Sequence, residues 1–195
     1  MLLTSSTVHQ VQQVSMRFRY LAAALLVISS AAAQNGQSKP SRPPDAPYVD
    51  SPYVVVDAML KLAGVKKSDT VYDLGCGDGR IVIAAAKHYG AHGVGIEINP
   101  DLVEKARGNA RRAHVEALVK FEVNDLFDAD IHNATVVTLY LLPNVNLRLR
   151  PKLFKELKPG TRVVSHSFSM DDWKPDKQET VDGNIIYLWT IPRKK

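Results

Sequence analysis

The chain has 195 residues, of which 45% are hydrophobic, and this length and composition suit one domain with a substantial core. The net charge of +5 is modest, and no dense basic stripe with interleaved aromatic residues is present, so we expect no nucleic-acid partner. Cys76 is the only cysteine, which excludes an intrachain disulfide and a cysteine metal cluster. The histidines are scattered, and we expect no metal site.

The N-terminal part of the chain resembles a targeting segment. Over residues 1–33, two arginines precede a short apolar run, and the alanines at 31–33 offer a small-residue cleavage site. We expect a cleaved signal peptide and hence an exported, periplasmic protein; the alternative is an uncleaved membrane anchor, and Met16 offers a second start. Residues 34–47, rich in proline and serine, are expected to form a disordered linker.

The folded domain is expected to span residues 48–195 and to begin with a helix capped by Ser51, with Pro52 at its first position. The next expected elements are a strand at 71–74, a helix at 81–89, a strand at 92–98 and a helix at 101–113 capped by Asn99-Pro100. They are followed by a strand at 119–123, a strand ending at Tyr140, a helix broken or restarted at Pro151, a strand at 161–168 and a hairpin around Asp182-Gly183. This alternation predicts a single α/β domain with a mostly parallel sheet and helices on both faces.

A glycine-rich turn follows the first strand, in the sequence VYDLGCGDGR at residues 71–80. Gly75, Gly77 and Gly79 stand at alternate positions, and glycine lets backbone amides approach a ligand without an intervening Cβ. The next helix presents its free N–H groups to this turn. Strand, turn and helix N-terminus together predict a cofactor cradle.

Acidic residues stand at the ends of three successive strands, where a parallel sheet binds its ligand. Asp73 can orient the glycine turn or receive a ligand ammonium, and Glu97 can accept hydrogen bonds from both hydroxyls of a ribose. Asn124-Asp125 follows the third strand, where the carboxylate can accept from an adenine amino group. Together these residues describe an adenosine site.

The glycine spacing indicates which adenosine cofactor fits. The pattern is D-x-G-x-G-x-G rather than G-x-G-x-x-G, and no P-loop is present. Asp78 within the turn would repel a pyrophosphate, whereas a sulfonium and an ammonium gain from Asp73 and Asp78. The turn therefore favours a cationic cofactor.

The chain resembles class I, seven-strand S-adenosylmethionine-dependent methyltransferases over residues 48–192. VYDLGCGDGR, GVGIEINP and VNDLFD are similar to the family's first, acidic-loop and adenine-contacting motifs. The resemblance implies a Rossmann-like fold with strand order 3-2-1-4-5-7-6. It also implies cofactor contacts from a set of residues that lie in or near these motifs: Tyr48, Asp73, Gly75, Gly77, Asp78, Glu97, Asn124 and Asp125.

A narrower resemblance is to the lysine methyltransferases of the ATP synthase c subunit, and more distantly to the non-SET histone lysine methyltransferase. It is carried by PYVDSP, LYLLPNVNLRLRPKL and GTRVVSHSF. In these families the segment before the first motif and the loop after the fourth strand shape the lysine channel. This implies that Leu142 and Pro143 line that channel and that Tyr140 or Asn144 orients the amine.

The sequence thus predicts an S-adenosylmethionine-dependent methyltransferase that acts on a protein lysine, and a membrane-associated protein is one candidate substrate. The alternatives are a small-molecule methyltransferase of the same fold and an exported adenosine-binding protein without catalysis. Cys76 is expected to pack inside the glycine turn. His166 follows the fifth strand and is expected to have a surface or capping position; the alternative is that it faces the substrate. The basic run Arg148, Arg150, Lys152 and Lys155 is expected to be a solvated helix face.

Overall fold

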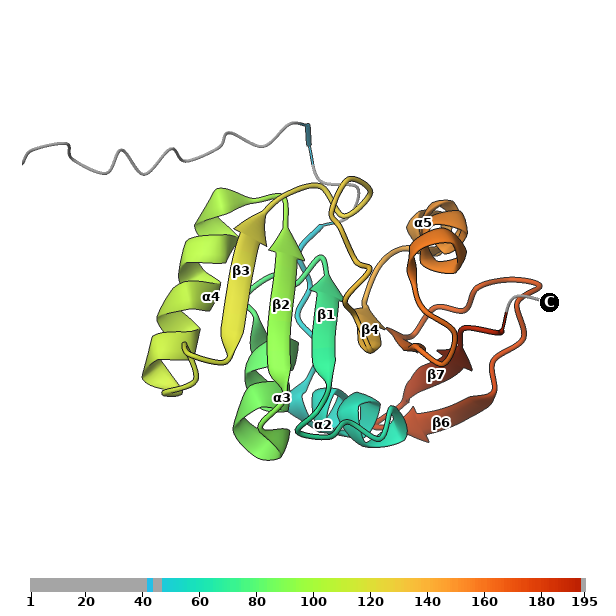
Figure 1. The fold of residues 1–195 in the computed structure, drawn as a ribbon, viewed down its shortest axis with the longest axis horizontal. Coiled ribbons are helices and arrows are strands. Elements are labelled where there is room, and N and C mark those ends of the chain that lie inside the picture. The colour runs from blue at the N-terminus through green and yellow to red at the C-terminus, as the bar shows by residue number, and fades with distance from the viewer. Residues whose placement is uncertain (1–41, 44–46, 194–195) are drawn as a thin grey trace, which may run out of the picture. The chain divides into compact units, whose positions relative to one another are not determined.

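A seven-stranded mixed sheet forms the centre of the computed structural model, which describes residues 42–43 and 47–193 (Figure 1). Its order, β3-β2-β1-β4-β5-β7-β6, confirms the prediction. The strands are β1 (Thr70–Leu74), β2 (His92–Glu97), β3 (Val119–Val123), β4 (Val136–Leu139), β5 (Arg162–His166), β6 (Lys177–Val181) and β7 (Asn184–Thr190). All pairings are parallel except those of β7 with β5 and β6.

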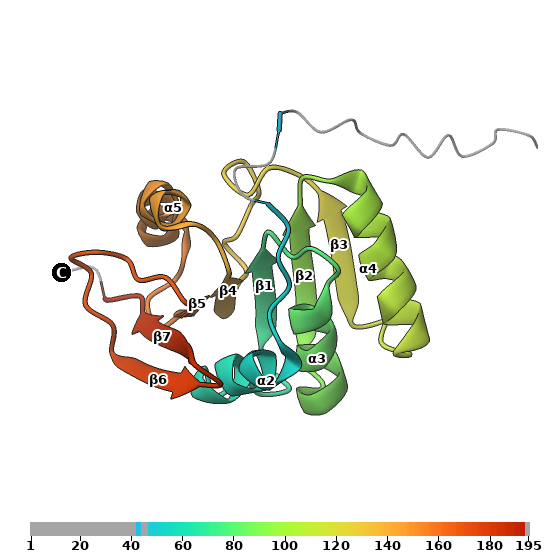
Figure 2. The same cartoon turned by 180° about the vertical axis from the view of Figure 1, so that it is seen from behind.

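Helices cover both faces of the sheet, but unequally. The helices are α2 (Tyr53–Leu62), α3 (Arg80–Tyr89), α4 (Pro100–Arg112) and α5 (Pro143–Glu156). The first three share one core with Val71 and Val164 of the sheet, on the side nearer the viewer in Figure 2. Of the helices in the described residues, only α5 packs on the other face, where Leu149 joins Val137 and Trp189 in a second core. The carboxyl ends of β1, β2 and β3 point to the same edge of the sheet (Figure 1).

Two local signals in the sequence give the expected geometry. The Asn99 side chain accepts a hydrogen bond from the backbone N–H of Asp101, with Pro100 at the first helical position, so α4 begins as predicted. Asp182 and Gly183 have φ angles of 50° and 74°, which is the turn geometry that the hairpin between β6 and β7 requires. Both the start of α4 and the hairpin are therefore confirmed.

Three expected boundaries are wrong. Ser51 is not the cap of α2, which begins at Tyr53 with Pro52 before it, because the Ser51 hydroxyl instead contacts His166. Helix α5 continues through Pro151: the carbonyl left without a helical partner is that of Leu147, a residue 38% exposed, where water can bond to it. Strand β4 ends at Leu139, so Tyr140 begins the following loop.

The described residues belong to one compact unit, and no helix among them is long and apolar enough to span a bilayer. The predicted targeting segment at 1–33 lies outside the described residues. Of the predicted linker at 34–47, the described residues include Arg42 and Pro47, which line a pocket on the domain.

Candidate active site

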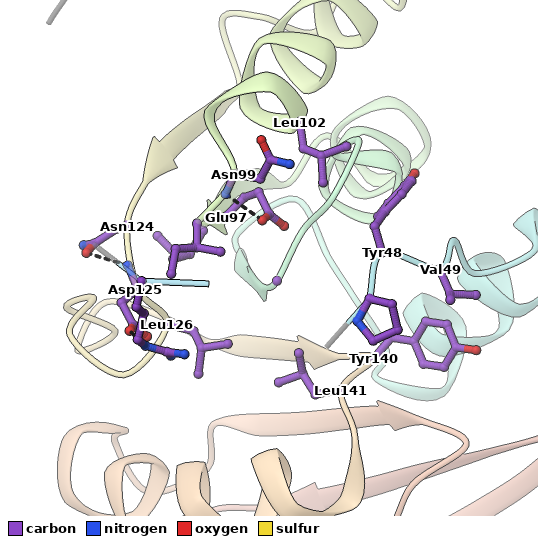
Figure 3. Close-up of a pocket in the computed structure, with 15 residues that line it drawn as sticks. Tyr48, Val49, Glu97, Asn99, Leu102, Asn124, Asp125, Leu126, Tyr140 and Leu141 are labelled. Carbon is purple, nitrogen blue, oxygen red and sulfur yellow. Dashed lines mark hydrogen bonds and ion pairs between the residues drawn. The ribbon is translucent and has the colours of Figure 1, made fainter. Parts of the chain in front are cut away.

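A pocket that is partly open to solvent lies at the carboxyl ends of the strands (Figure 3). Asn124 and Asp125 stand at one end, Glu97 at one side, and Tyr48 and Tyr140 at the other end. A smaller hollow adjoins it and is lined by Asp73, the glycine turn and Ser51 among others. The space suits a nucleoside with an extended substituent.

The glycine turn adopts the left-handed backbone that its glycines permit. Gly75 and Gly77 have φ angles of 83° and 53°. A Cβ on Gly77 would overlap the ring of Tyr48, and one on Gly75 would lie 3.0 Å from Leu141. The turn is tied to β2, because the N–H groups of Gly75 and Cys76 donate to the carbonyl of Ile96. Because Gly75 and Gly77 have no side chains, the floor of the pocket stays open.

Glu97 stands at the end of β2 with its side chain fixed at both oxygens. Oε2 accepts from the N–H of Gly77 at 3.0 Å, and Oε1 accepts from the N–H of Asn99 at 2.9 Å. The residue is only 8% exposed and lines the larger pocket. A carboxylate held in this way retains lone pairs for the hydroxyls of a ribose.

Asp125 lies at the far end of the pocket after β3. Its Oδ1 accepts from the N–H of Phe127 at 2.9 Å, and its Oδ2 contacts Arg42 Nε at 2.6 Å. The predicted adenine partner is thus paired with a residue from the segment before the domain. Neighbouring Asn124 also lines the pocket, with its Oδ1 accepting from the N–H of Asp125.

Asp73 is almost fully buried at the end of β1, beside the smaller hollow. Burial raises its pKa to about 7; the Thr138 hydroxyl, which donates to Oδ1 at 2.8 Å, opposes this, while the charges of Glu97 and Asp78 add to it. A cation placed near this carboxyl would favour its ionised form. Asp73 therefore fits the ammonium group of a ligand.

Asp78 is engaged by its own neighbour. Arg80 Nε and Nη2 donate to the two carboxylate oxygens of Asp78, at 3.0 and 2.9 Å. Although burial acts in the opposite direction, these hydrogen bonds and the charge of Arg80 hold the pKa of Asp78 below its ordinary value. Arg80 also contacts Asp50 and donates to the carbonyl of Ser51 at 2.8 Å. Asp78 thus anchors the segment before α2 to the glycine turn, a role that its sequence position did not suggest.

Of the residues predicted for the acceptor end, some line the pockets and others do not. Tyr140 lines both pockets. Leu142, Pro143 and Asn144 line neither and lie exposed at the start of α5, so they form the rim of the site rather than its wall. Leu141, which the sequence also offers as an apolar wall, is the apolar residue of this loop that lines the pocket.

Two polar residues at this end of the site are fully buried, which the sequence did not predict. His166 is fully buried, so its predicted surface or capping position is wrong: the last residue of β5 lies beneath Tyr140 rather than at the end of an exposed strand. Asn146 is also fully buried and donates to Ser165 Oγ and the carbonyl of Phe168, each at 3.3 Å. Only the helical period of α5, which turns position 146 inward, could have indicated the latter.

The remaining side-chain predictions have simple outcomes. Cys76 is buried, and burial raises the pKa of its thiol well above the ordinary value, so it packs inside the turn as predicted. On the basic run of α5, Arg148 and Lys155 are exposed as predicted, whereas Arg150 pairs with Asp172, and Lys152 with Glu156 at 2.7 Å. The expectation of no metal site stays a prediction.

The sheet order and the described pocket define the class of protein, a Rossmann-like S-adenosylmethionine-dependent methyltransferase. The family model for the ANTKMT methyltransferase domain matches residues 73–177, and the chain belongs to this family. The cofactor fits the site, because a buried carboxyl suits its ammonium, a glycine-rich turn leaves room for its sulfonium region, and two pocket-lining carboxylates at strand ends suit its adenosine.

Relatives support this assignment over most of the domain. A protein-lysine N-methyltransferase of Saccharolobus islandicus is 48% identical over 157 residues, which cover 78% of this chain and 98% of that protein. The human lysine N-methyltransferase that is named for the c subunit of ATP synthase is 36% identical over 130 residues, and the match covers 67% of this chain and 55% of the human protein. The chain thus spans about half the length of the latter.

A solved structure is also similar. The crystal structure of an RNA methyltransferase from Salinibacter ruber, in complex with S-adenosyl-L-homocysteine, is 60% identical with a TM-score of 0.74. The match covers 75% of this chain and 96% of that one.

Proposed function

We propose that this methyltransferase modifies the side-chain amine of a lysine in a protein substrate. The similarity to the Saccharolobus islandicus protein-lysine N-methyltransferase, over nearly all of that protein's length, supports this acceptor. The observation in the structure that carries the proposal is the end of the pocket at Tyr140, where an aromatic ring and apolar side chains meet. An amine must be neutral to attack, and such surroundings favour the neutral form through desolvation.

When bound, S-adenosylmethionine supplies an electrophilic methyl group on its sulfonium. Asp73 would hold the ammonium of the cofactor, Glu97 its ribose hydroxyls and Asp125 its adenine amino group. The glycine turn gives access to the cofactor, and Tyr48 closes the pocket above Gly77. This chain thus contributes chiefly by holding two reactants in line.

Tyr140 is our candidate for orienting the lysine amine, since it lines both pockets. The amine nitrogen attacks the methyl carbon as the carbon–sulfur bond breaks, and the lysine ammonium loses its proton to solvent before the attack. Leu141 supplies an apolar wall, and the exposed rim of Leu142, Pro143 and Asn144 is placed to meet the polypeptide that carries the lysine.

The substrate protein is proposed to be membrane-associated. Large apolar side chains are exposed on the segment before α2, at the start of α2, on α5 and on β7: Tyr48, Val49, Tyr53, Val54, Leu142, Leu147 and Ile185. Exposed apolar side chains close to a site are suited to an apolar partner. An RNA acceptor, the substrate in the name of the Salinibacter ruber protein, is less well supported, since Arg150 and Lys152 of α5 are paired within the chain.

The location of the protein is part of the same proposal. We propose that residues 1–33 direct export to the periplasm, with a retained membrane anchor as the alternative. N-terminal sequencing of the protein purified from its host discriminates between them. An N-terminus at Gln34 supports export, and a retained apolar run supports anchoring.

Methyl transfer from radiolabelled S-adenosylmethionine tests the acceptor. The enzyme is incubated in parallel with detergent-solubilised membrane protein, soluble protein, total RNA and a small-molecule fraction, and labelled protein is analysed by mass spectrometry. We expect methyl-lysine in the membrane fraction, and a loss of at least tenfold for Tyr140→Ala relative to an exposed control, Lys177→Ala. Label confined to RNA or small molecules refutes the lysine proposal.

A further inference from the structure

A buried polar contact connects the segment before α2 to the acceptor end of the site. The Ser51 hydroxyl and His166 Nδ1 lie 2.8 Å apart, although 115 positions separate them in the chain. His166 has no solvent exposure, and Ser51 has 3%. A hydrogen bond in such a place must form when the domain folds, since neither group has water as an alternative partner.

On one side, this contact reaches the cofactor machinery. The carbonyl of Ser51 accepts from Arg80 Nη1 at 2.8 Å, and Arg80 holds Asp78 of the glycine turn. The residues immediately before Ser51 line the pocket, with Tyr48 above Gly77. Ser51 is therefore fixed at two points, its backbone to the glycine turn and its side chain to β5.

On the other side, the imidazole supports the residue proposed to orient the amine. The rings of His166 and Tyr140 are stacked, with centroids 3.9 Å apart and planes inclined by 25°. Phe168 stacks more loosely on Tyr140, at 6.5 Å. Since Tyr140 follows the end of β4 directly, the close stacking on His166 is what fixes its ring against the sheet.

The imidazole is suited to this position in its neutral form. Burial lowers the pKa of His166, with the side chain of Asn184 opposing this, and no carboxylate is bonded to the ring among the described residues. Nε2 is buried and makes no well-formed hydrogen bond within that part of the chain. A charged ring here would repel the positive sulfonium, and it would also repel the lysine side chain in its charged form.

We propose that His166 is a positioning residue with two separable roles. Its ring holds Tyr140 in the orientation needed for methyl transfer, and its Nδ1 holds the segment before α2 over the cofactor through Ser51. The first role rests on the proposed lysine acceptor site, whereas the second concerns cofactor binding alone. His166 thus serves the cofactor end and the acceptor end of the site through different parts of its side chain.

Three variants separate the two roles. Ser51→Ala removes the hydrogen bond and keeps the ring, His166→Asn keeps a polar group near Nδ1 and removes the ring, and His166→Phe keeps a ring without the hydrogen bond. His132→Asn, at an exposed histidine outside both pockets, is the matched control. Each variant is measured for S-adenosylhomocysteine affinity by calorimetry, for kcat at saturating cofactor, and for Tm.

We expect Ser51→Ala to weaken S-adenosylhomocysteine binding about fivefold with kcat changed less than twofold, the loss typical of one buried hydrogen bond. His166→Asn should lower kcat at least tenfold while affinity changes less than twofold, because misplacing a reacting partner acts on the chemical step. His166→Phe should recover most of that kcat and show the affinity defect of Ser51→Ala. A residue with a purely structural role would not lower affinity in one variant and kcat in another.

The proposal is overturned if His166→Asn keeps the wild-type kcat. It is equally overturned if all three variants lose affinity and kcat together in proportion to a fall in Tm. Failure of the lysine assignment is a distinct result, because the wild-type enzyme would then methylate no lysine. The affinities of Ser51→Ala and His166→Phe for S-adenosylhomocysteine would still test whether Nδ1 holds the segment before α2 over the cofactor.

Discussion

The buried carboxyl of Asp73 gives the sharpest prediction, because its protonation should be linked to cofactor binding. Its pKa is raised to about 7 from 3.8, first by burial, so near neutral pH the cofactor-free protein is about half protonated at this position. If the ionised carboxylate receives the ammonium of the cofactor, a proton must leave before the pair can form. A pKa of about 7 then makes the apparent affinity about tenfold weaker at pH 6 than at pH 8.

The same carboxyl should influence stability without ligand. Because its pKa is higher in the folded than in the unfolded protein, the folded state holds the proton more tightly between pH 3.8 and about 7. Stability contributed by this group is complete below that window and is lost as pH rises through it. The difference between the two pKa values corresponds to roughly 4 kcal/mol.

Calorimetry of S-adenosylhomocysteine binding between pH 6 and 8, in buffers of differing ionisation enthalpy, measures both the affinity and the protons released. Asp73→Asn keeps an acceptor for Thr138 and cannot ionise. We expect weaker binding with a flat pH profile, no proton release, and higher Tm than the wild type at pH 8. An unchanged pH dependence in Asp73→Asn would refute the reasoning, as would a wild-type affinity that does not vary between pH 6 and 8.

Three further predictions concern the pocket. Asp125→Ala should weaken S-adenosylhomocysteine binding at least tenfold, with Asp125→Asn intermediate; equal affinity by calorimetry would contradict its adenine role. Arg42→Ala should tighten binding up to about fivefold, since this partly exposed ion pair competes for Asp125; weaker binding would mean that Arg42 instead contacts the cofactor. Gly77→Ala should displace Tyr48 and weaken binding more than tenfold, and it should also lower Tm, because a φ of 53° strains an alanine; unchanged affinity would contradict the role of this glycine.

Local patterns account for much of what the sequence predicted correctly. The glycine turn, the Asn99 cap and the Asp182-Gly183 hairpin are each defined by a few adjacent residues whose backbone preferences suffice. The predicted acidic side chains at the ends of β1, β2 and β3 line the two pockets, because parallel strands align their carboxyl ends. The strand order came from the resemblance to class I methyltransferases rather than from periodicity.

Where local rules failed, a distant partner had changed the outcome. Ser51 has the chemistry of a helix cap, yet its hydroxyl is bonded to His166. Pro151 has the chemistry of a helix breaker, yet burial of Leu149 and Leu153 on either side keeps α5 continuous. In each case tertiary packing outweighs a preference of about 1 to 3 kcal/mol.

The sequence by itself determined the class of this protein and the cofactor cradle, since both depend on residues that are adjacent or that lie at the ends of consecutive strands. Only the tertiary structure decided that Arg42 pairs with Asp125, that Arg80 joins the glycine turn to Ser51, and that His166 lies beneath Tyr140. The physical reason is that these contacts join residues tens of positions or more apart. The first two depend on how the segment before α2 lies against the domain, and the third on the pairing of β4 with β5. No local periodicity records either.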